Sequence, residues 1–337
     1  MNMRRVLAVA GIVIVLATSA ACSAKESSAS GGTSGVKITL AFSAWPGWFP
    51  WQVAADKGLF KANNVNVELK YFDDYSASLQ ALSTGNVTAN SQTLNDTLIS
   101  ISAAGAAKQT IVLVNDNSTG NDQIIARAGI NTVADLKGKT VAVEQGAVDH
   151  FLLLLALQKA GLTGNDVTIK TLPTADAAAA FKAGQVDAVG AFAPFTTTAL
   201  ERSGSKTIAT SKDFPGAIPD HLVFDAKFVA AHPTEVQAVV KTWFDTLKWI
   251  SANKDAAIAI MAKRGGVSAD DYKSYDAGTT IFTKEQNLAA FASGSTSANL
   301  DYQAAQISNF LVGTGLAPTK PDLTGLFEPK FVAAVGS

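Results

Sequence analysis

The sequence predicts an α/β protein made of two similar lobes followed by a helical C-terminal region. Strand-like and helix-like segments alternate along residues 36–190, an order typical of parallel α/β sheets. One stretch recurs 99 residues later, because residues 79–90 (LQALSTGNVTAN) match residues 178–189 (AAAFKAGQVDAV). After about residue 222 the pattern becomes mostly helical. A length of 337 residues suits about two domains.

The first unit begins with a strand at residues 36–42 (VKITLAF), which is rich in β-branched residues. Residues 65–71 (VNVELKY) alternate polar and apolar side chains with a period of two, as a second strand does. Gly85 is placed to end a helix in the left-handed conformation. The remaining elements of this unit are expected as strands at 87–90 and 110–115 and helices at 52–63, 76–84 and 93–104.

The second unit repeats this order of strands and helices. Gly161 and Gly184 follow its two helices, as Gly85 follows a helix of the first unit. The repeat places a glycine, a polar residue and Val-x-Ala at the same point of both units, which indicates two lobes of one design. Its elements are expected as strands at 139–143, 167–171 and 186–190 and helices at 147–159 and 176–182.

The C-terminal region is predicted to be helical and to pack on the first lobe. Residues 234–252 place Val236, Val240 and Trp243 on one broad apolar face. Thr283 and Gln286 form a capping box at the start of another helix. The further helices are expected at 255–263, 268–276, 283–293 and 300–312.

Residues 1–21 are predicted to be an export signal peptide, with Arg4 and Arg5 before an apolar run of eleven residues that is short for a membrane span. Cys22, the single cysteine, follows small residues as in the lipobox of bacterial lipoproteins, although Ser19 stands where that pattern favours leucine. Cys22 is therefore expected to carry the lipid, the alternative being ordinary cleavage beside a stray cysteine. Residues 22–35, rich in Ser, Gly and Ala, are expected to be a flexible tether.

Composition excludes several classes of function. Net charge is −1, with 27 basic and 28 acidic residues and no basic run, so no nucleic-acid partner is expected. His150, His221 and His232 show no metal-ligand spacing, and no nucleophile or phosphate-loop motif occurs. We therefore predict no enzyme activity, no cofactor and no metal. One cysteine allows no internal disulfide.

Four segments carry a resemblance to a known family. They are Trp45-Pro-Gly-Trp-Phe-Pro-Trp51 with the following Ala-Ala-Asp-Lys-Gly-Leu-Phe60, Leu79 with Gly85 and Val87, Asp-Leu-Lys-Gly-Lys-Thr-Val-Ala-Val143, and Ala-Ala-Phe-Lys-Ala-Gly-Gln-Val-Asp-Ala188. In these residues the chain resembles the nitrate/taurine/sulfonate family of ABC-transporter substrate-binding lipoproteins. The resemblance covers roughly residues 38–225 well and the helical tail loosely.

That resemblance implies the fold of a type II periplasmic binding protein, in which ligand binds between two lobes joined by two hinge crossings. The crossings are expected near residues 121–124 and 219–223. Lobe 1 would then comprise residues 36–121 plus 222–337, and lobe 2 residues 122–221. The implied partners are a small-molecule ligand, an ABC permease with its ATPase, and the bacterial cell membrane. The lipid anchor would hold the protein on that membrane, facing the periplasm or the cell exterior. The protein is expected to act as a monomer.

In open α/β sheets, ligands bind beyond the carboxyl ends of the strands. The loop after the first strand holds Trp45, Trp48 and Trp51, and Trp45 and Trp48 are expected to form an apolar wall for ligand. Alternatively, these rings form a hydrophobic plug under the lobe. Proline and glycine between them indicate that the rings are displayed on a loop. Phe192 follows a strand of the second unit and is expected to form the opposite wall.

The polar candidates lie at other strand ends. Gln92, Asn95 and Asp96 stand at a helix N-terminus, where backbone N–H groups favour an anion. Asp96 could instead simply complement the helix dipole. The other expected ligand-binding residues are Asn117, Glu144, Gln145 and Gly146.

The expected cleft combines aromatic surface, helix N-termini and carboxylates. Such a cleft suits a ligand that carries both a cationic or hydrogen-bond-donor group and an anionic or hydrogen-bond-acceptor group. An amino-sulfonate such as taurine is the leading expectation, and a thiamine-precursor pyrimidine is the alternative. A non-transport surface-binding lipoprotein is the remaining rival.

Overall fold

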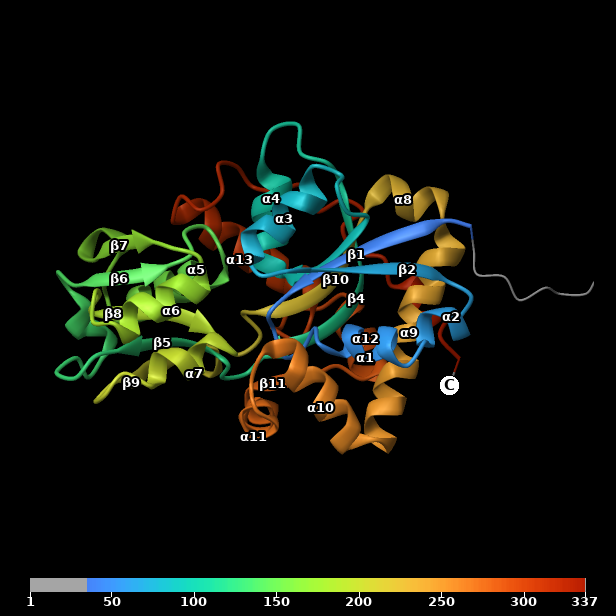
Figure 1. The fold of residues 1–337 in the computed structure, drawn as a ribbon. Helices are drawn as coiled ribbons and strands as arrows, with labels where there is room; N and C mark the ends of the chain where they lie inside the picture. Colours follow the sequence, from blue (N-terminus) through green and yellow to red (C-terminus); the bar gives the residue numbers. More distant parts are fainter. Residues whose placement is uncertain (1–34, 337) are drawn as a thin grey trace, which may run out of the picture. The chain divides into compact units, whose positions relative to one another are not determined.

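The protein is described by a computed structural model that covers residues 35–336. All of its elements belong to one compact unit, Thr33–Ser337, and they form two separate β-sheets with flanking helices (Figure 1). The expected signal peptide, Cys22 and nearly all of the expected tether lie outside the described residues. None of the described helices is long and apolar enough to cross a membrane.

The first sheet has six strands and the second has five. In spatial order the first sheet contains β11 (Thr279–Ile281), β4 (Gln109–Ser118), β10 (Pro219–Asp225), β3 (Ala89–Thr93), β1 (Lys37–Ser43) and β2 (Asn66–Phe72). The second contains β7 (Thr168–Thr171), β6 (Thr140–Val143), β8 (Ala188–Phe192), β5 (Asp122–Ala126) and β9 (Lys206–Thr210).

The two sheets repeat one plan. The order β2-β1-β3-β10-β4 corresponds to β7-β6-β8-β5-β9, with three parallel strands followed by an antiparallel one. Gly85 and Gly184 take φ values of 74° and 79° directly before the equivalent strands β3 and β8. A positive φ is accessible to glycine at little cost, which explains the recurrence at these two turns.

Both sheets are mixed, whereas the alternation of strands and helices had indicated parallel sheets. β10 runs antiparallel to β3 and β4, and β5 runs antiparallel to β8 and β9. β5 follows a strand of the first sheet and β10 follows a strand of the second, so each enters its sheet after the chain has crossed over. Residues 219–221 already pair within the first sheet, although we expected the second lobe to extend to residue 221.

Fourteen α-helices lie within the described residues, and in Figure 1 α3 and α4 lie on one side of the first sheet while α1 and α9 lie on the other. The helix expected at 52–63 is broken at Gly58, whose φ is 67°. The helices are α1 (Pro50–Asp56), α2 (Leu59–Ala62), α3 (Tyr75–Ser83), α4 (Leu94–Ser102), α5 (Val148–Lys159), α6 (Thr174–Lys182), α7 (Phe195–Leu200), α8 (Ala226–Ala231), α9 (Pro233–Ala252), α10 (Lys254–Gly265), α11 (Ala269–Ser274), α12 (Lys284–Phe291), α13 (Leu300–Gly313) and α14 (Lys330–Ala333). Short 3-10 turns are η1 (Val133–Leu136), η2 (Gly164–Asp166), η3 (Ser211–Asp213) and η4 (Tyr275–Gly278).

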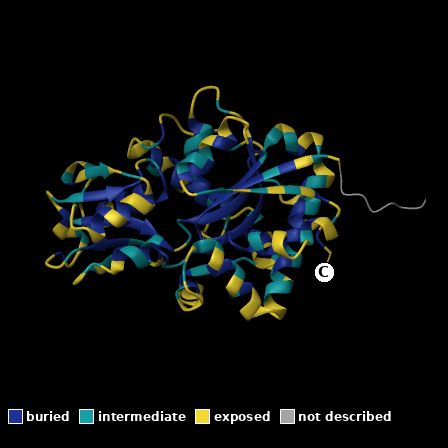
Figure 2. Cartoon of the chain, in the orientation of Figure 1, coloured by how far each residue is buried: buried dark blue, intermediate teal, exposed yellow. Residues whose placement is uncertain are grey.

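The C-terminal helices complete the first sheet's core, as expected. α9 packs against α1 and α2, and Trp243 on α9 meets Trp51 on α1 with ring centroids 4.6 Å apart. The capping box of Thr283 and Gln286 begins α12. α13 reaches the second sheet's side, where Phe310 meets Phe151 of α5. Buried residues are concentrated in the strands and in the helix faces turned toward them (Figure 2).

Candidate functional site

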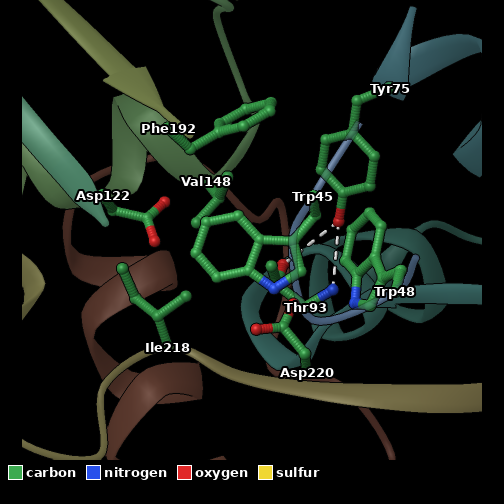
Figure 3. Close-up of a pocket in the computed structure, with 9 residues that line it drawn as sticks. All are labelled: Trp45, Trp48, Tyr75, Thr93, Asp122, Val148, Phe192, Ile218 and Asp220. Atoms are coloured by element: carbon green, nitrogen blue, oxygen red, sulfur yellow. Dashed lines mark hydrogen bonds between the residues drawn. The ribbon is translucent and has the colours of Figure 1, made fainter. Parts of the chain in front are cut away.

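A pocket lies between the two sheets and takes its walls from both (Figure 3). Strand ends and helix starts position the lining residues. From the first sheet's side they are Trp45, Trp48, Tyr75, Thr93, Ile218 and Asp220, and from the second sheet's side Asp122, Val148 and Phe192. The free space between them is about 10 Å³, which is room for about one water molecule.

Four aromatic side chains form a closed ring of contacts, which we call the aromatic box. Trp45 lies 6.4 Å from Trp48, Trp48 lies 5.4 Å from Tyr75, and Tyr75 lies 6.2 Å from Phe192, measured between ring centroids. Phe192 lies 6.3 Å from Trp45 and so completes the ring. Three of the rings belong to the first sheet's side, and only Phe192, at the end of β8, comes from the second.

The loop after β1 holds Trp45 in a fixed orientation. Trp45 Nε1 donates to Asp116 Oδ1 at 2.9 Å, and the backbone N–H of Trp48 donates to the Trp45 carbonyl at 3.0 Å. Gly47 is required here, because a Cβ at that position would lie 2.1 Å from Asp116 Oδ2. The Tyr75 hydroxyl accepts from the Thr93 backbone N–H at 3.0 Å, which positions another ring of the box.

Trp51 is not displayed on the loop, which corrects our expectation for that ring. It lies in the first turn of α1, preceded by Pro50 at a position where proline suits a helix. Its Nε1 donates to Ser91 Oγ at 2.9 Å, and its ring contacts Trp243. Proline marks the helix start here and does not exclude a helix.

Carboxyl groups dominate the electrostatics of the pocket. Asp122 and Asp220 line it, and Asp116 lies behind Trp45. Burial raises the pKa of Asp116 and of Asp122 to about 7. Burial, together with repulsion from Asp116 and Asp122, holds the pKa of Asp220 well above its usual range. Among the residues that the structure describes, no lysine or arginine lines the pocket.

His221 follows Asp220 on β10 and is fully buried. Neither of its ring nitrogens has a hydrogen-bond partner. Burial lowers its pKa to about 3, so its ring is neutral and supplies no positive charge to the carboxyl groups.

The three predicted residues around the start of α4 do not line this pocket. Gln92 Nε2 donates to Thr97 Oγ1 and to Gln109 Oε1, so the side-chain amide of Gln92 is engaged in buried hydrogen bonds away from the pocket. Asn95 Nδ2 and Thr93 Oγ1 each donate to Asp96 at 2.7 Å. Asp96 is fully buried, and burial raises its pKa to about 7. Only Thr93 of this loop reaches the pocket.

Glu144 joins elements of the two sheets. Its Oε1 accepts from the backbone N–H of Ser76 in α3 at 2.9 Å. Its Oε2 accepts from Thr174 in α6, from the backbone N–H at 3.2 Å and from Oγ1 at 2.9 Å. The carboxylate thus lies at the starts of two helices, one from each sheet's side, next to the pocket.

The other predicted polar residues lie elsewhere. Gln145 accepts from Thr171 at the surface, and the N–H of Gly146 donates to His150 Nδ1 at 3.1 Å. The strand expected at 110–115 continues as β4 to Ser118. Asn117 on that strand lines a separate groove with Thr119, Pro219 and other residues.

Sequence reasoning missed Tyr75, Asp122 and Asp220 as pocket residues. The two aspartates lie in segments that we assigned to the hinge crossings, where Asp122 is the first residue of β5 and Asp220 is the second residue of β10. A carboxylate at the start of a strand of otherwise mostly apolar residues is the signal that could have indicated them, because a buried charge usually has a function.

A family model described as the NMT1-like family matches residues 32–265. A Brucella abortus protein named as a binding protein is 29% identical over 215 residues, which cover 63% of this chain and 66% of the relative. An Escherichia coli protein named as an aliphatic sulfonates-binding protein is 32% identical over 168 residues, 50% of this chain and 49% of the relative. The chain therefore spans slightly less than two thirds of the Brucella relative and about half of the Escherichia coli one.

Among solved structures, the alkanesulfonate-binding protein of Xanthomonas axonopodis bound to MOPS has the same fold. It superposes with a TM-score of 0.74 at 20% identity and covers 87% of this chain and 98% of its own. The likeness confirms the two-lobed α/β fold of periplasmic binding proteins that the sequence predicted.

Proposed function

The chain belongs to the NMT1-like family, and we propose on that premise that it is the extracytoplasmic solute-binding component of an ABC importer. Relatives named as binding proteins support a role in binding a solute. An ABC permease and its ATPase would be the partners that receive the solute.

One observation carries the proposal: the pocket is built jointly by the two sheets. We assign the first sheet and its helices to lobe 1 and the second sheet and its helices to lobe 2. This follows the expected division (36–121 plus 222–337, and 122–221), except that residues 219–221, which pair within the first sheet, go with lobe 1. Phe192 and Asp122 of lobe 2 face Trp45 and Asp220 of lobe 1 across the pocket. With room for about one water molecule, the pocket must open to admit an organic solute. A receptor that closes on its ligand has this arrangement.

We further propose that the protein is a lipoprotein. Cys22 would become the lipidated first residue after removal of residues 1–21, and the Ser- and Gly-rich segment that follows would tether a monomeric body to the membrane. Growth of an expressing bacterium with radioactive palmitate tests the anchor. Label that is incorporated by the natural chain and lost in Cys22→Ser would support it, and an unlabelled chain would contradict it.

For the ligand we propose a small polar organic molecule, with an amino-sulfonate such as taurine as the leading candidate. Relatives named for sulfonates favour this class, and the aromatic box offers an apolar wall. A thiamine-precursor pyrimidine is the alternative, because a planar heterocycle could stack on the same rings.

Isothermal titration calorimetry, with tryptophan fluorescence alongside, tests the receptor function. Titration with taurine, ethanesulfonate, an aminopyrimidine, nitrate and sulfate should give heat and an emission change with at least one organic compound, because closure changes the surroundings of Trp45 and Trp48. Binding restricted to nitrate or sulfate, or binding without any fluorescence change, would contradict the proposal.

A further inference from the structure

Resting on that proposed function, we propose that the pocket recognises the positively charged end of its ligand, an organic ammonium group held within the aromatic box against the carboxyl groups of Asp122 and Asp220. The group that decides affinity would then be the cation, and an accompanying sulfonate would be secondary.

The aromatic box supplies the first part of this recognition. The faces of Trp, Tyr and Phe rings carry partial negative charge, and several rings around one point attract an ammonium ion, most strongly when water is excluded. Trp45, Trp48, Tyr75 and Phe192 contact one another in a ring, and each is almost fully buried. Because only Phe192 comes from lobe 2, opening the lobes would separate it from the other three and admit the ligand between them.

The carboxyl groups supply the second part. Asp122 Oδ2 is buried and has no hydrogen-bond partner, and Figure 3 shows this carboxyl group directed into the pocket. Asp220 reaches the pocket beside the Trp45 indole (Figure 3). A buried acceptor without a donor is costly unless a ligand supplies one. An ammonium group offers both the missing donor and the missing positive charge.

The same surroundings disfavour an anion. The pocket has no lysine or arginine among its lining residues, and His221 is neutral. Glu144 already occupies the backbone N–H groups at the starts of α3 and α6, which are the donors that would otherwise suit a sulfonate. A sulfonate placed in the box would face carboxyl groups without any compensating cation.

Protonation reduces the charge repulsion between these buried carboxyl groups. Raised pKa values near 7 leave Asp116 and Asp122 partly protonated at neutral pH. A bound cation would favour their charged forms, so binding should release protons and strengthen as pH rises. The other titratable groups around the pocket are Asp220 and His221 on β10, Asp96 on α4, Asp149 on α5, Glu144 after β6 and Tyr75 on α3.

Calorimetry with matched probes tests the inference. Taurine has an ammonium and a sulfonate, isethionate replaces the ammonium by a hydroxyl, and ethanolamine replaces the sulfonate by a hydroxyl. Choline adds a quaternary ammonium. We expect isethionate to bind at least about tenfold more weakly than taurine, and choline or ethanolamine to bind at least as well as taurine. Isethionate binding as tightly as taurine would overturn the inference and leave the receptor function standing. Absence of binding by every ammonium and sulfonate probe would overturn the inference, and absence of aminopyrimidine binding as well would contradict the receptor function.

Two variants test whether Asp122 is a group that binds the ammonium ion. Asp122→Asn keeps the shape of the side chain and removes a buried charge, so it should fold normally by circular dichroism and weaken binding of the best ammonium probe by at least about tenfold. The control is Asp176→Asn, which removes the charge of an exposed aspartate in lobe 2. It should change the affinity for the same probe by less than about twofold. Affinity of the natural chain should rise between about pH 6 and pH 8, and this rise should flatten in Asp122→Asn. Unchanged affinity in a folded Asp122→Asn protein would overturn the inference.

Discussion

Buried aspartates and one buried histidine act in opposite directions on the pH dependence of stability. Asp96, Asp116 and Asp122 have pKa values of about 7 in the folded chain, above the usual value for aspartate of 3.8. Their favourable contribution to the free energy of unfolding is complete below pH 3.8 and is lost as pH rises through about 7. His221 has a folded pKa of about 3, below its usual value of 6.5. Its contribution is complete above pH 6.5 and is lost as pH falls toward 3.

The aspartates outnumber the histidine, and they decide the sign. Between about pH 4 and pH 6.5 the folded chain holds more protons than the unfolded chain, so the free energy of unfolding should fall as pH rises. Carboxyl groups with lowered pKa values, such as Asp135 and Asp322, are exposed, and solvent screens their effect.

We therefore expect the ligand-free protein to have a higher Tm at about pH 5 than at about pH 8 when measured by scanning calorimetry. Asp122→Asn removes one of the groups that take up a proton on folding, so it should reduce this difference in Tm. A higher Tm at the alkaline end would contradict the assignment of buried, protonated carboxyl groups.

At the same scale, the aromatic half of the pocket was predictable except for Tyr75, and the acidic half was not. Trp45 and Trp48 follow β1 and Phe192 ends β8, and the rule that ligands bind beyond strand ends indicated these three as pocket residues. Asp122 and Asp220 lie at the starts of their strands, as the first residue of β5 and the second residue of β10. They reach the same place because β5 and β10 run antiparallel to their neighbours, which brings strand starts beside strand ends. That reversal depends on the crossing between sheets, which no local pattern records.

Among the elements, β4 presents an edge that three different partners cover. β11 pairs with residues 116–118 of β4, and Ile111 pairs with residues 326–328 near the other end. Between them, Asn287 of α12 uses its side-chain amide as a strand would. Its Oδ1 accepts from the N–H of Val114 at 2.7 Å, and its Nδ2 donates to the Val114 carbonyl at 3.0 Å. A helix side chain thereby satisfies both backbone groups of a buried strand residue.

Replacing Asn287 should therefore cost more than an ordinary helix substitution. Asn287→Ala leaves the N–H and C=O of Val114 buried without partners, at about 1–3 kcal/mol for each group. We expect the free energy of unfolding in urea to fall by about 2–5 kcal/mol. Hydrogen exchange at the Val114 amide should also accelerate. The control is Gln286→Ala, which removes only the exposed hydrogen bond that the Thr283 backbone N–H donates to Gln286 Oε1. This substitution should lower the free energy of unfolding by about 1 kcal/mol. Equal losses in both variants would contradict this role.

Element existence was largely predictable for the strands and helices that alternate in β-α order. Expected strands at 36–42, 65–71 and 139–143 lie within a residue or so of β1, β2 and β6. β5, β9, β10 and β11 were missed. β5 and β10 lie in segments assigned to the hinge crossings, and β9 and β11 lie at sheet edges, so the sheet partner decides their structure more than their own residues do.

Over the whole molecule, a hydrogen bond to one carboxylate joins the two proposed lobes beside the pocket. Glu144 of lobe 2 accepts a hydrogen bond from the N–H of Ser76 in lobe 1, while its other oxygen is held by Thr174 in its own lobe. Such a hydrogen bond to a charged group contributes about 1.5–3 kcal/mol. Removing it should raise the population of open molecules by about 10- to 100-fold, because each 1.4 kcal/mol is a factor of ten.

The prediction is that ligand-free Glu144→Ala has a larger radius of gyration by small-angle X-ray scattering than the natural chain, and that saturating ligand restores the compact form. Gln145→Ala is the matched control, because this neighbour bonds only to Thr171 within lobe 2. The affinity of Glu144→Ala for ligand should fall, since binding must now supply the free energy of closure that Glu144 contributed. If both variants scatter as the natural chain does, the contact at Ser76 does not hold the lobes closed, and closure rests instead on the aromatic box and on the contact of Phe310 with Phe151.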